Sequence, residues 1–292
     1  MRRGFTVAEL LAAMLISGAA AGAVLGILFS CFKSLELHRD LAQATLRAEL
    51  ALAMIQPFVL NAGLGVPNAR PGEFLKGDNG VSLPLVRDFE RPVQLALSAA
   101  AVSSFSAAPA LWTVYSVPGG RGTRNEALLT RGEECHLPLD GGVLNPVLVV
   151  AGTYDMKSWV TFPSAGYPLR VTRRSDYSLN VMPQEDCAVA AFDELHFVRA
   201  AKIFLSAGTL TIDRMDGSGA QPGVSGVVGT WFEFDQEGRT LTARVLARSE
   251  EKRSGPARGS LEEWPEDAVP KVADLTPGYR YVVAMRSWRV RN

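Results

Sequence analysis

The hydrophobic pattern of the chain begins with a long apolar run from Phe5 to Phe32, in which Glu9 is the one charged residue. A helix of this length is about 42 Å long at about 1.5 Å per residue, and about 20 apolar residues cross a bilayer core. The short basic segment Met1-Arg2-Arg3-Gly4 precedes the run, and Lys33 follows it. Because basic residues stay on the cytoplasmic side, residues 5–32 are predicted to cross a membrane once, with the rest of the chain beyond it.

The helical pattern continues over residues 33–62 in amphipathic form. Charged residues there separate apolar positions that recur at three- and four-residue steps, namely Leu37, Leu41, Ala44, Ala48 and Leu52. This spacing predicts an apolar helix face, and a β-sheet is the expected cover. Pro57 is predicted to end or kink the helix, because proline removes a backbone donor. Asn61-Ala62-Gly63 then supplies stop residues.

Short apolar runs separated by glycine and proline are typical of the remainder, residues 63–292. In its first half, strands are predicted at 111–115, 147–150 and 159–162, with turns at 118–120 and 140–142. From about Ala188 the pattern predicts two hairpins, one of 194–205 with 209–212 and one of 230–234 with 241–248. Residues 249–277 are predicted to form a long surface loop, and 279–290 a closing strand.

The second arm of the later hairpin shows the clearest alternation. Leu241, Ala243, Val245 and Ala247 alternate with Thr242, Arg244 and Leu246, which is the period of a half-buried strand. Together these patterns predict an α+β protein, in which a long N-terminal helix packs on an antiparallel β-sheet domain.

Composition and charge narrow the function classes. The 292 residues are 47% hydrophobic and 21% charged, an ordinary composition for a folded protein. Thirty basic residues balance thirty acidic ones, so nothing in the charge predicts a nucleic-acid partner.

The candidate chemistry is sparse. His38, His136 and His196 are far apart, and no phosphate-binding or nucleophile-elbow motif occurs in the sequence. The segment 213–219 resembles a calcium loop faintly but lacks its ligand alternation, so we interpret it as a turn. We therefore expect no catalytic residues, no metal and no cofactor.

The chain has three cysteines, Cys31, Cys135 and Cys187, and their spacing matches no zinc pattern. If the globular part is exported, a disulfide between Cys135 and Cys187 is expected. Three unpaired, buried thiols are the alternative.

Gly18, Gly22 and Gly26 repeat at four-residue steps on one face of the apolar helix. Such a face allows two helices to approach closely in lipid, although a span rich in alanine and glycine produces the same spacing by composition alone.

The segment Gly4-Phe5-Thr6-Val7-Ala8-Glu9-Leu10-Leu11 resembles the processing motif of type IV prepilins and type II secretion pseudopilins. The resemblance implies that prepilin peptidase cuts between Gly4 and Phe5 and methylates the new amine of Phe5. It also implies that Glu9 neutralises the terminal amine of an adjacent subunit during assembly with other minor and major pilins. The implied location is the bacterial inner membrane, with a periplasmic globular domain, and then the pilus or its tip.

Two other interpretations of the N-terminus are weaker. An ordinary signal peptide with a cut site near Ala19–Ala23 would have a shorter apolar core, whereas this run continues and contains Glu9. A plain single-pass anchor leaves Glu9 unexplained.

The C-terminal half adds a second resemblance. Its predicted strands at 210–214, 223–224, 231–235 and 241–249, and its ending Arg289-Val290-Arg291-Asn292, are similar to those of PilW-type minor pilins. Many major pilins carry a proline within this helix, whereas this chain has Gly26 near that position. This departure also favours a minor subunit that initiates or caps assembly. A J-type pseudopilin, usually shorter, and a pilus-tip adhesin are the alternatives; an enzyme is not expected.

Overall fold

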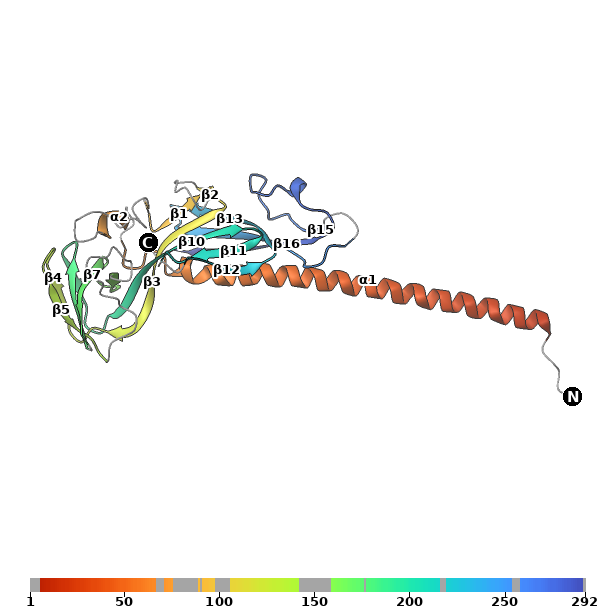
Figure 1. Cartoon of the computed structure of the whole chain (residues 1–292), viewed down its shortest axis with the longest axis horizontal. Helices are drawn as coiled ribbons and strands as arrows, with labels where there is room; N and C mark the ends of the chain where they lie inside the picture. Colours follow the sequence, from red (N-terminus) through yellow and green to blue (C-terminus); the bar gives the residue numbers. More distant parts are fainter. Residues whose placement is uncertain are drawn as a thin grey trace.

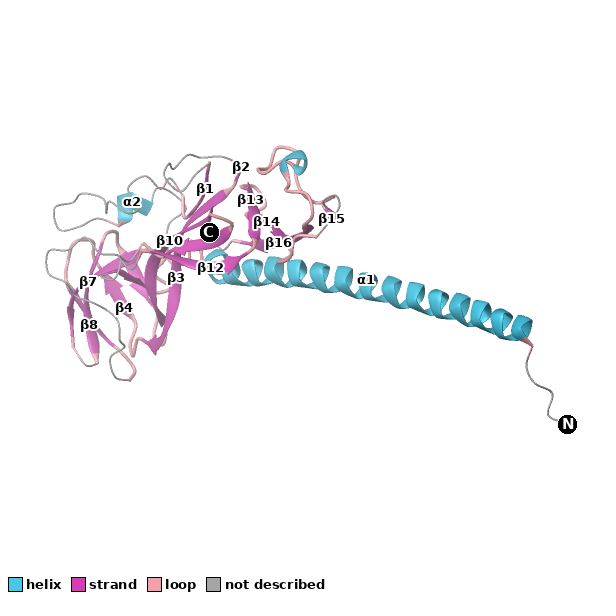
Figure 2. Cartoon of the chain, turned by 45° about the vertical axis from the view of Figure 1, so that its right-hand side comes forward, coloured by secondary structure: helices cyan, strands magenta, loops and turns pink. Residues whose placement is uncertain are grey.

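The computed structural model describes residues 6–66, 71–75, 89, 91–97, 106–141, 159–175, 177–215, 219–253 and 258–290. One long helix, α1 (Val7–Leu60), extends from the globular part and carries the N-terminus far from it (Figure 1). The rest of the described chain is mainly strand (Figure 2). The predicted layout of a long N-terminal helix followed by an antiparallel β domain is therefore confirmed.

Helix α1 is unbroken over 54 residues, so the segment predicted to cross a membrane and the amphipathic segment form one element. Pro57 was predicted to end or kink the helix; it lies in the last turn and does not end it, because α1 continues to Leu60. The stop is made by Asn61, whose backbone N–H and side-chain Nδ2 both donate to the Pro57 carbonyl, at 3.3 and 3.1 Å. Gly63 then turns the chain at φ +71°, a conformation that glycine adopts without strain.

Two sheets cover the C-terminal half of α1. The smaller has five strands in the order β15-β16-β14-β13-β2, antiparallel except for the β15–β16 pair. Its strands are β2 (Ala107–Ala108), β13 (Val227–Asp235), β14 (Thr240–Arg248), β15 (Arg258–Ser260) and β16 (Arg280–Arg289). The predicted hairpin of 230–234 with 241–248 and the predicted closing strand are confirmed as β13–β14 and β16.

The larger sheet has nine strands, with the main order β1-β3-β10-β6-β7-β8-β5 and with β11 and β12 beside β10. Its strands are β1 (Val93–Ala96), β3 (Ala110–Gly122), β5 (Cys135–Pro138), β6 (Trp159–Thr161), β7 (Pro168–Arg174), β8 (Ser178–Pro183), β10 (Glu194–Ser206), β11 (Thr209–Asp213) and β12 (Ala220–Ser225). A separate pair joins β4 (Ala127–Leu129) to β9 (Cys187–Val189), and short helical turns lie at α2 (Pro71–Phe74) and η2 (Val272–Asp274).

Strand β10 connects two parts of the molecule. Its first residues pair with β6 and its last five with β11, while β3 follows its other edge. The predicted hairpin of 194–205 with 209–212 is thus confirmed. We call the strands β4 to β9 the distal lobe, because they lie at the end of the molecule opposite the N-terminus (Figures 1 and 2).

Each of the two parts has a hydrophobic cluster of its own. The first lies between α1 and the sheets, where Ala48, Leu52 and Ile55 of the helix are fully buried with Val245 and other residues of β14 and β16. The predicted apolar face of residues 33–62 is confirmed there, although Leu37 and Leu41, nearer the N-terminus, are half-buried. The second cluster fills the distal lobe around Leu137 and Phe162.

The predictions for the first half of the domain have different outcomes. The strand at 159–162 is confirmed as β6, and the one at 111–115 lies within β3. The turn at 118–120 is wrong, since Pro118 pairs with His196 inside β3, next to a shift of register. Proline and glycine there mark an irregularity within the strand, and the chain does not reverse direction. Gly120 adopts φ +66° at this irregularity. The strand predicted at 147–150 lies outside the described residues.

The segment 249–277 is more than the surface loop that was predicted. It contains β15 and η2, and Trp264 is buried against Trp231 and Leu246. Leu246, expected on the polar face of its strand, is therefore buried as well. A Cβ at Gly229 would come within 2.7 Å of the Trp264 ring, so glycine is needed where the segment packs on β13.

Candidate functional site

The N-terminal half of α1 is an exposed apolar rod. Among the described residues, α1 is the one helix long and apolar enough to cross a membrane. Its most apolar stretch is not buried at all by the rest of the described chain. Apolar surface of this extent is stable in lipid or against other apolar helices, and not in water.

Glu9 stands at the start of this rod and is held by Thr6. Its Oε2 accepts the Thr6 backbone N–H at 2.9 Å and the Thr6 hydroxyl at 3.0 Å, and its own N–H donates to Thr6 Oγ1 at 3.3 Å. This is a capping box, the reciprocal arrangement that begins many helices. Sequence reasoning expected a partner for Glu9 after cleavage and missed Thr6, although the spacing Thr-x-x-Glu signals it. Gly4 and Phe5 lie outside the described residues, so cleavage and methylation stay predictions.

The glycine face of α1 is open. A Cβ placed on Gly18, Gly22 or Gly26 would meet no atom within 4 Å. Nothing in the single described chain therefore requires glycine at these positions. The face has room for a second helix, and its role in helix packing stays a prediction.

An apolar stripe continues along α1 beyond the predicted membrane segment. Leu46, Leu50 and Met54 follow one another at four-residue steps and are 60%, 48% and 36% exposed. Met54 also lines a groove of about 430 Å³, with Phe58 from the helix and Ile212 from β11. Sequence reasoning identified the buried face and missed this second one, although the same four-residue spacing marks it.

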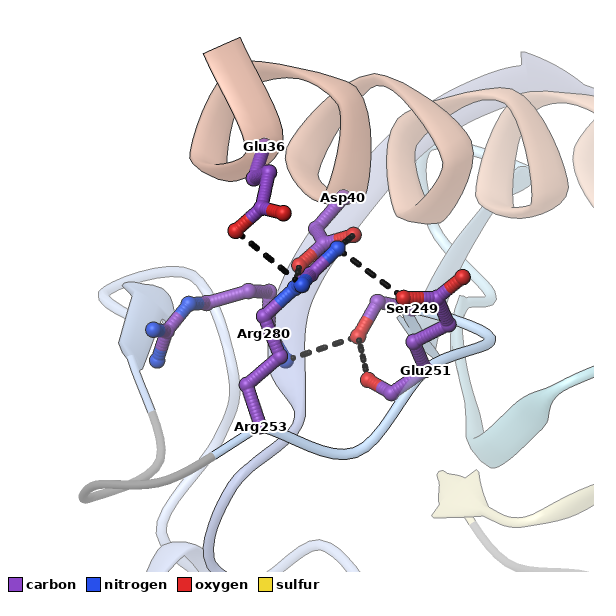
Figure 3. Close-up of polar contacts among 6 residues, drawn as sticks. All are labelled: Glu36, Asp40, Ser249, Glu251, Arg253 and Arg280. Carbon is purple, nitrogen blue, oxygen red and sulfur yellow. Dashed lines mark hydrogen bonds and ion pairs between the residues drawn. The ribbon is translucent and has the colours of Figure 1, made fainter. Parts of the chain in front are cut away.

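Arg253 joins the base of the globular domain to α1 (Figure 3). Its Nε donates to Asp40 Oδ2 at 2.7 Å, and its other nitrogens lie 3.1 Å from Glu36 and 2.9 Å from Glu251. Asp40, which sequence reasoning counted among the polar residues between the apolar positions, is 2% exposed. The hydrogen bond to Asp40, together with the charges of the nearby carboxylates, raises the pKa of the Arg253 guanidinium above its ordinary value.

The backbone around Arg253 is also fixed. The Arg280 N–H donates to Ser249 Oγ at 3.0 Å, and that hydroxyl donates to the Glu251 carbonyl at 3.1 Å (Figure 3). Ser249 is 1% exposed, so this part of the loop has a definite position under the helix.

Two further arginines hold α1 along its length. Arg286 of β16 donates to Glu49 at 2.8 Å and to Gln56 at 3.2 Å. Arg47 of the helix donates to the Arg248 carbonyl at 3.0 Å. Helix and domain are thus joined by polar contacts on both sides of the apolar interface.

Cys135 and Cys187 are free thiols in the structure, and both pack against the hydrophobic cluster of the distal lobe. Burial, together with the neighbouring Asp186, raises the pKa of the Cys187 thiol to about 11. The structure contains no bond between Cys135 and Cys187. The alternative of three buried, unpaired thiols fits only in part, because Cys31 is exposed and the other two are half-buried.

The described residues contain no group of His, Cys, Asp and Glu that could hold a metal ion. His196 has Ser116 Oγ at 3.4 Å and Glu194 at 3.6 Å, which is the set of residue types found in hydrolases. Ser116 lies on β3, paired with Val198 of β10, and is fully buried, so its hydroxyl does not face a substrate. At 213–215 the Asp213 carboxylate accepts the Met215 N–H at 2.9 Å, as expected for a turn.

No known protein family, curated protein or solved structure matches the chain.

Proposed function

We propose that this protein is a membrane-anchored, pilin-like subunit, most similar to PilW-type minor pilins, that helps to initiate or cap the assembly of a type IV pilus. The proposal rests chiefly on α1. Its apolar surface stays exposed along the predicted membrane segment and continues as the stripe of Leu46, Leu50 and Met54, while the domain covers the opposite face. A helix with two apolar faces suits a subunit that binds its own domain on one side and other subunits on the other.

Glu9 would supply specificity to this packing. A carboxylate in the middle of a spanning helix costs about 2.5–3.5 kcal/mol, and less near an end. The Thr6 bonds satisfy part of its hydrogen-bonding capacity but leave its charge unneutralised. Prepilin peptidase would expose the amine of Phe5, and this amine on one subunit would neutralise the Glu9 carboxylate of its neighbour.

Two substitutions separate the capping role of Glu9 from its charge. Glu9→Gln removes the charge but keeps an acceptor for the Thr6 N–H, whereas Thr6→Ala removes the hydroxyl half of the cap but keeps the charge. If the charge recruits a neighbour, Glu9→Gln abolishes incorporation into filaments and Thr6→Ala preserves most of it. Membrane insertion remains normal in both, and fractionated pili probed for the subunit provide the measurement.

Equal incorporation of Glu9→Gln and wild type would refute the assembly role. The processing step is tested independently by the mass of the mature N-terminus. A chain that starts at N-methylated Phe5 is expected, and a start near Val24 or an intact Met1 would overturn it.

The J-type pseudopilin belongs to the same structural class, and a deletion strain separates the two. Loss of pili and surface motility is expected for a minor pilin, and stalled exoprotein release for a pseudopilin.

A tip adhesin has one observation in its favour. Phe192, in the distal lobe, is 77% exposed at φ +61°, and its N–H donates to the Thr123 carbonyl at 2.8 Å. A rigid exposed aromatic is typical of binding surfaces. If the lobe binds surfaces or sugars, Phe192→Ala lowers adhesion of piliated cells and leaves pilus number unchanged.

A further inference from the structure

A cavity lies where the apolar part of α1 meets the globular domain. It measures about 510 Å³, and its walls come from two segments far apart in the sequence. One wall is Phe29, Phe32 and Lys33 of the helix, and the other is Lys252, Arg253 and Arg280 of the domain.

The position of this cavity along α1 gives its two ends different surroundings. Phe32 is the last residue of the apolar run and Lys33 the first charge after it. The four helical steps from Phe29 to Lys33 span about 6 Å at about 1.5 Å per residue. With α1 across a bilayer, the phenylalanines lie at the acyl chains and the lysines at the headgroups.

Four cations line the cavity, and the two lysines among them are available to a ligand. Arg253 is paired with Asp40, Glu36 and Glu251, and Glu36 is the carboxylate among the lining residues. Lys33 and Lys252 make no ion pair within the described part of the chain, and both are exposed. Two lysine ammonium groups above an apolar wall are complementary to a phosphate that carries acyl chains.

We propose that this cavity binds the phosphate headgroup of an anionic phospholipid of the outer leaflet of the membrane that α1 crosses. Lys33 and Lys252 contact the phosphate from opposite walls, while Phe29 and Phe32 contact the first carbons of the acyl chains. The bound lipid would join helix and domain at the membrane surface. This inference rests on the membrane position of α1 and not on assembly into a filament.

The full-length protein, reconstituted in nanodiscs of phosphatidylcholine with or without phosphatidylglycerol, provides the test. Native mass spectrometry of protein released from the mixed discs counts the lipids that remain bound. Wild type is expected to retain phosphatidylglycerol in preference to phosphatidylcholine. In Lys33→Gln/Lys252→Gln the ratio of retained phosphatidylglycerol to phosphatidylcholine is expected to fall about tenfold. The matched control is Arg124→Gln/Lys271→Gln, which removes two exposed cations outside the cavity and keeps the preference.

Three results would overturn the proposal: equal retention of the two lipids by wild type, an unchanged preference in the lysine variant, or the same loss in the control. A further arm distinguishes a lipid from a free anion. Inorganic phosphate added to the protein in detergent is expected to leave its thermal stability unchanged, and stabilisation that Lys33→Gln/Lys252→Gln abolishes would instead identify a phosphate site. None of these readouts depends on pili, so they remain informative if the proposed assembly role fails.

Discussion

Among single residues, Arg253 and Asp40 show how the helix is held to the domain. Asp40 is nearly inaccessible to solvent, and its carboxylate is bonded to Arg253. Arg253 has two further acidic partners, Glu36 and Glu251. The pair is therefore asymmetric. Arg253 keeps two acidic partners if Asp40 is lost, whereas Asp40 loses the cation that neutralises it if Arg253 is lost.

This asymmetry predicts unequal effects of two alanine substitutions. Asp40→Ala removes the two charge-assisted hydrogen bonds to Arg253 and is expected to lower the free energy of unfolding by about 1–3 kcal/mol. Arg253→Ala is expected to lower it further, because Asp40 is left as a buried carboxylate without its partner. Denaturant unfolding of the full-length protein in detergent measures both.

The double variant Asp40→Ala/Arg253→Ala is expected to be more stable than Arg253→Ala alone, since it removes the stranded charge. Arg131→Ala, which breaks an exposed pair with Glu185, serves as the control and leaves stability unchanged. A double variant less stable than Arg253→Ala would contradict this account.

Cys187 allows a prediction for pH. Burial raises the pKa of its thiol from an ordinary 9.0 to about 11, and the thiolate is the reactive form. Alkylation by iodoacetamide is therefore slow at pH 8 and rises toward pH 11, whereas the unfolded chain reacts from about pH 9. Because the folded pKa is the higher one, the stabilisation from the protonated thiol is complete below pH 9 and is lost as pH rises to about 11.

Peptide mass spectrometry after timed alkylation follows Cys187 specifically. Rapid modification of folded, reduced protein at pH 8 would show that the thiol is not buried. Protein from oxidising conditions that reacts only after reduction would instead show that Cys135 and Cys187 pair as the sequence predicts.

At the scale of elements, α1 has three surfaces. One face of its C-terminal half is buried in the domain, the stripe of Leu46, Leu50 and Met54 is exposed, and the N-terminal half is apolar all round. A surface helix in a globular protein needs one apolar face. The additional apolar surface is what a partner helix or the bilayer would cover.

The glycine face gives a test of helix pairing. Gly22→Leu fills open space in the single chain and raises helix propensity, so the thermal stability of the isolated protein in detergent is not expected to fall. Close approach of a second helix is blocked, and association of α1 in membranes is expected to weaken by about tenfold. A genetic assay of transmembrane-helix association provides the measurement.

Ala20→Leu is the control for that test, because it places the same leucine side chain on the opposite side of the helix. Equal weakening by both substitutions, or by neither, would show that the glycine spacing reflects composition and not packing.

For the whole molecule, the important feature is the separation between its ends. The apolar rod and Glu9 lie at one end, and the distal lobe with its own hydrophobic cluster lies at the other (Figure 1). Arg47, Arg253 and Arg286 fix the domain to α1 between them. A displacement of the helix along the membrane normal would therefore carry the distal lobe with it, as the proposed assembly role requires.

The sequence by itself determined the features that depend on neighbours along the chain. The helix of α1, the hairpins β10–β11 and β13–β14 and the strand β16 follow from local periodicity and turn residues, because each repeats within a few residues. The capping box of Thr6 and Glu9 is equally local and could have been read from its spacing.

Only the tertiary structure decided the features that need residues distant in sequence. Asp40 is buried because Arg253, 213 residues away, neutralises it. Leu246 and Trp264 are buried because a charged, proline-rich segment folds back over the outer face of β13. The cavity between Phe32 and Lys252 exists because the domain contacts the helix where its apolar run ends. Burial and charge pairing depend on which segments meet in space, and local patterns along the chain do not record this.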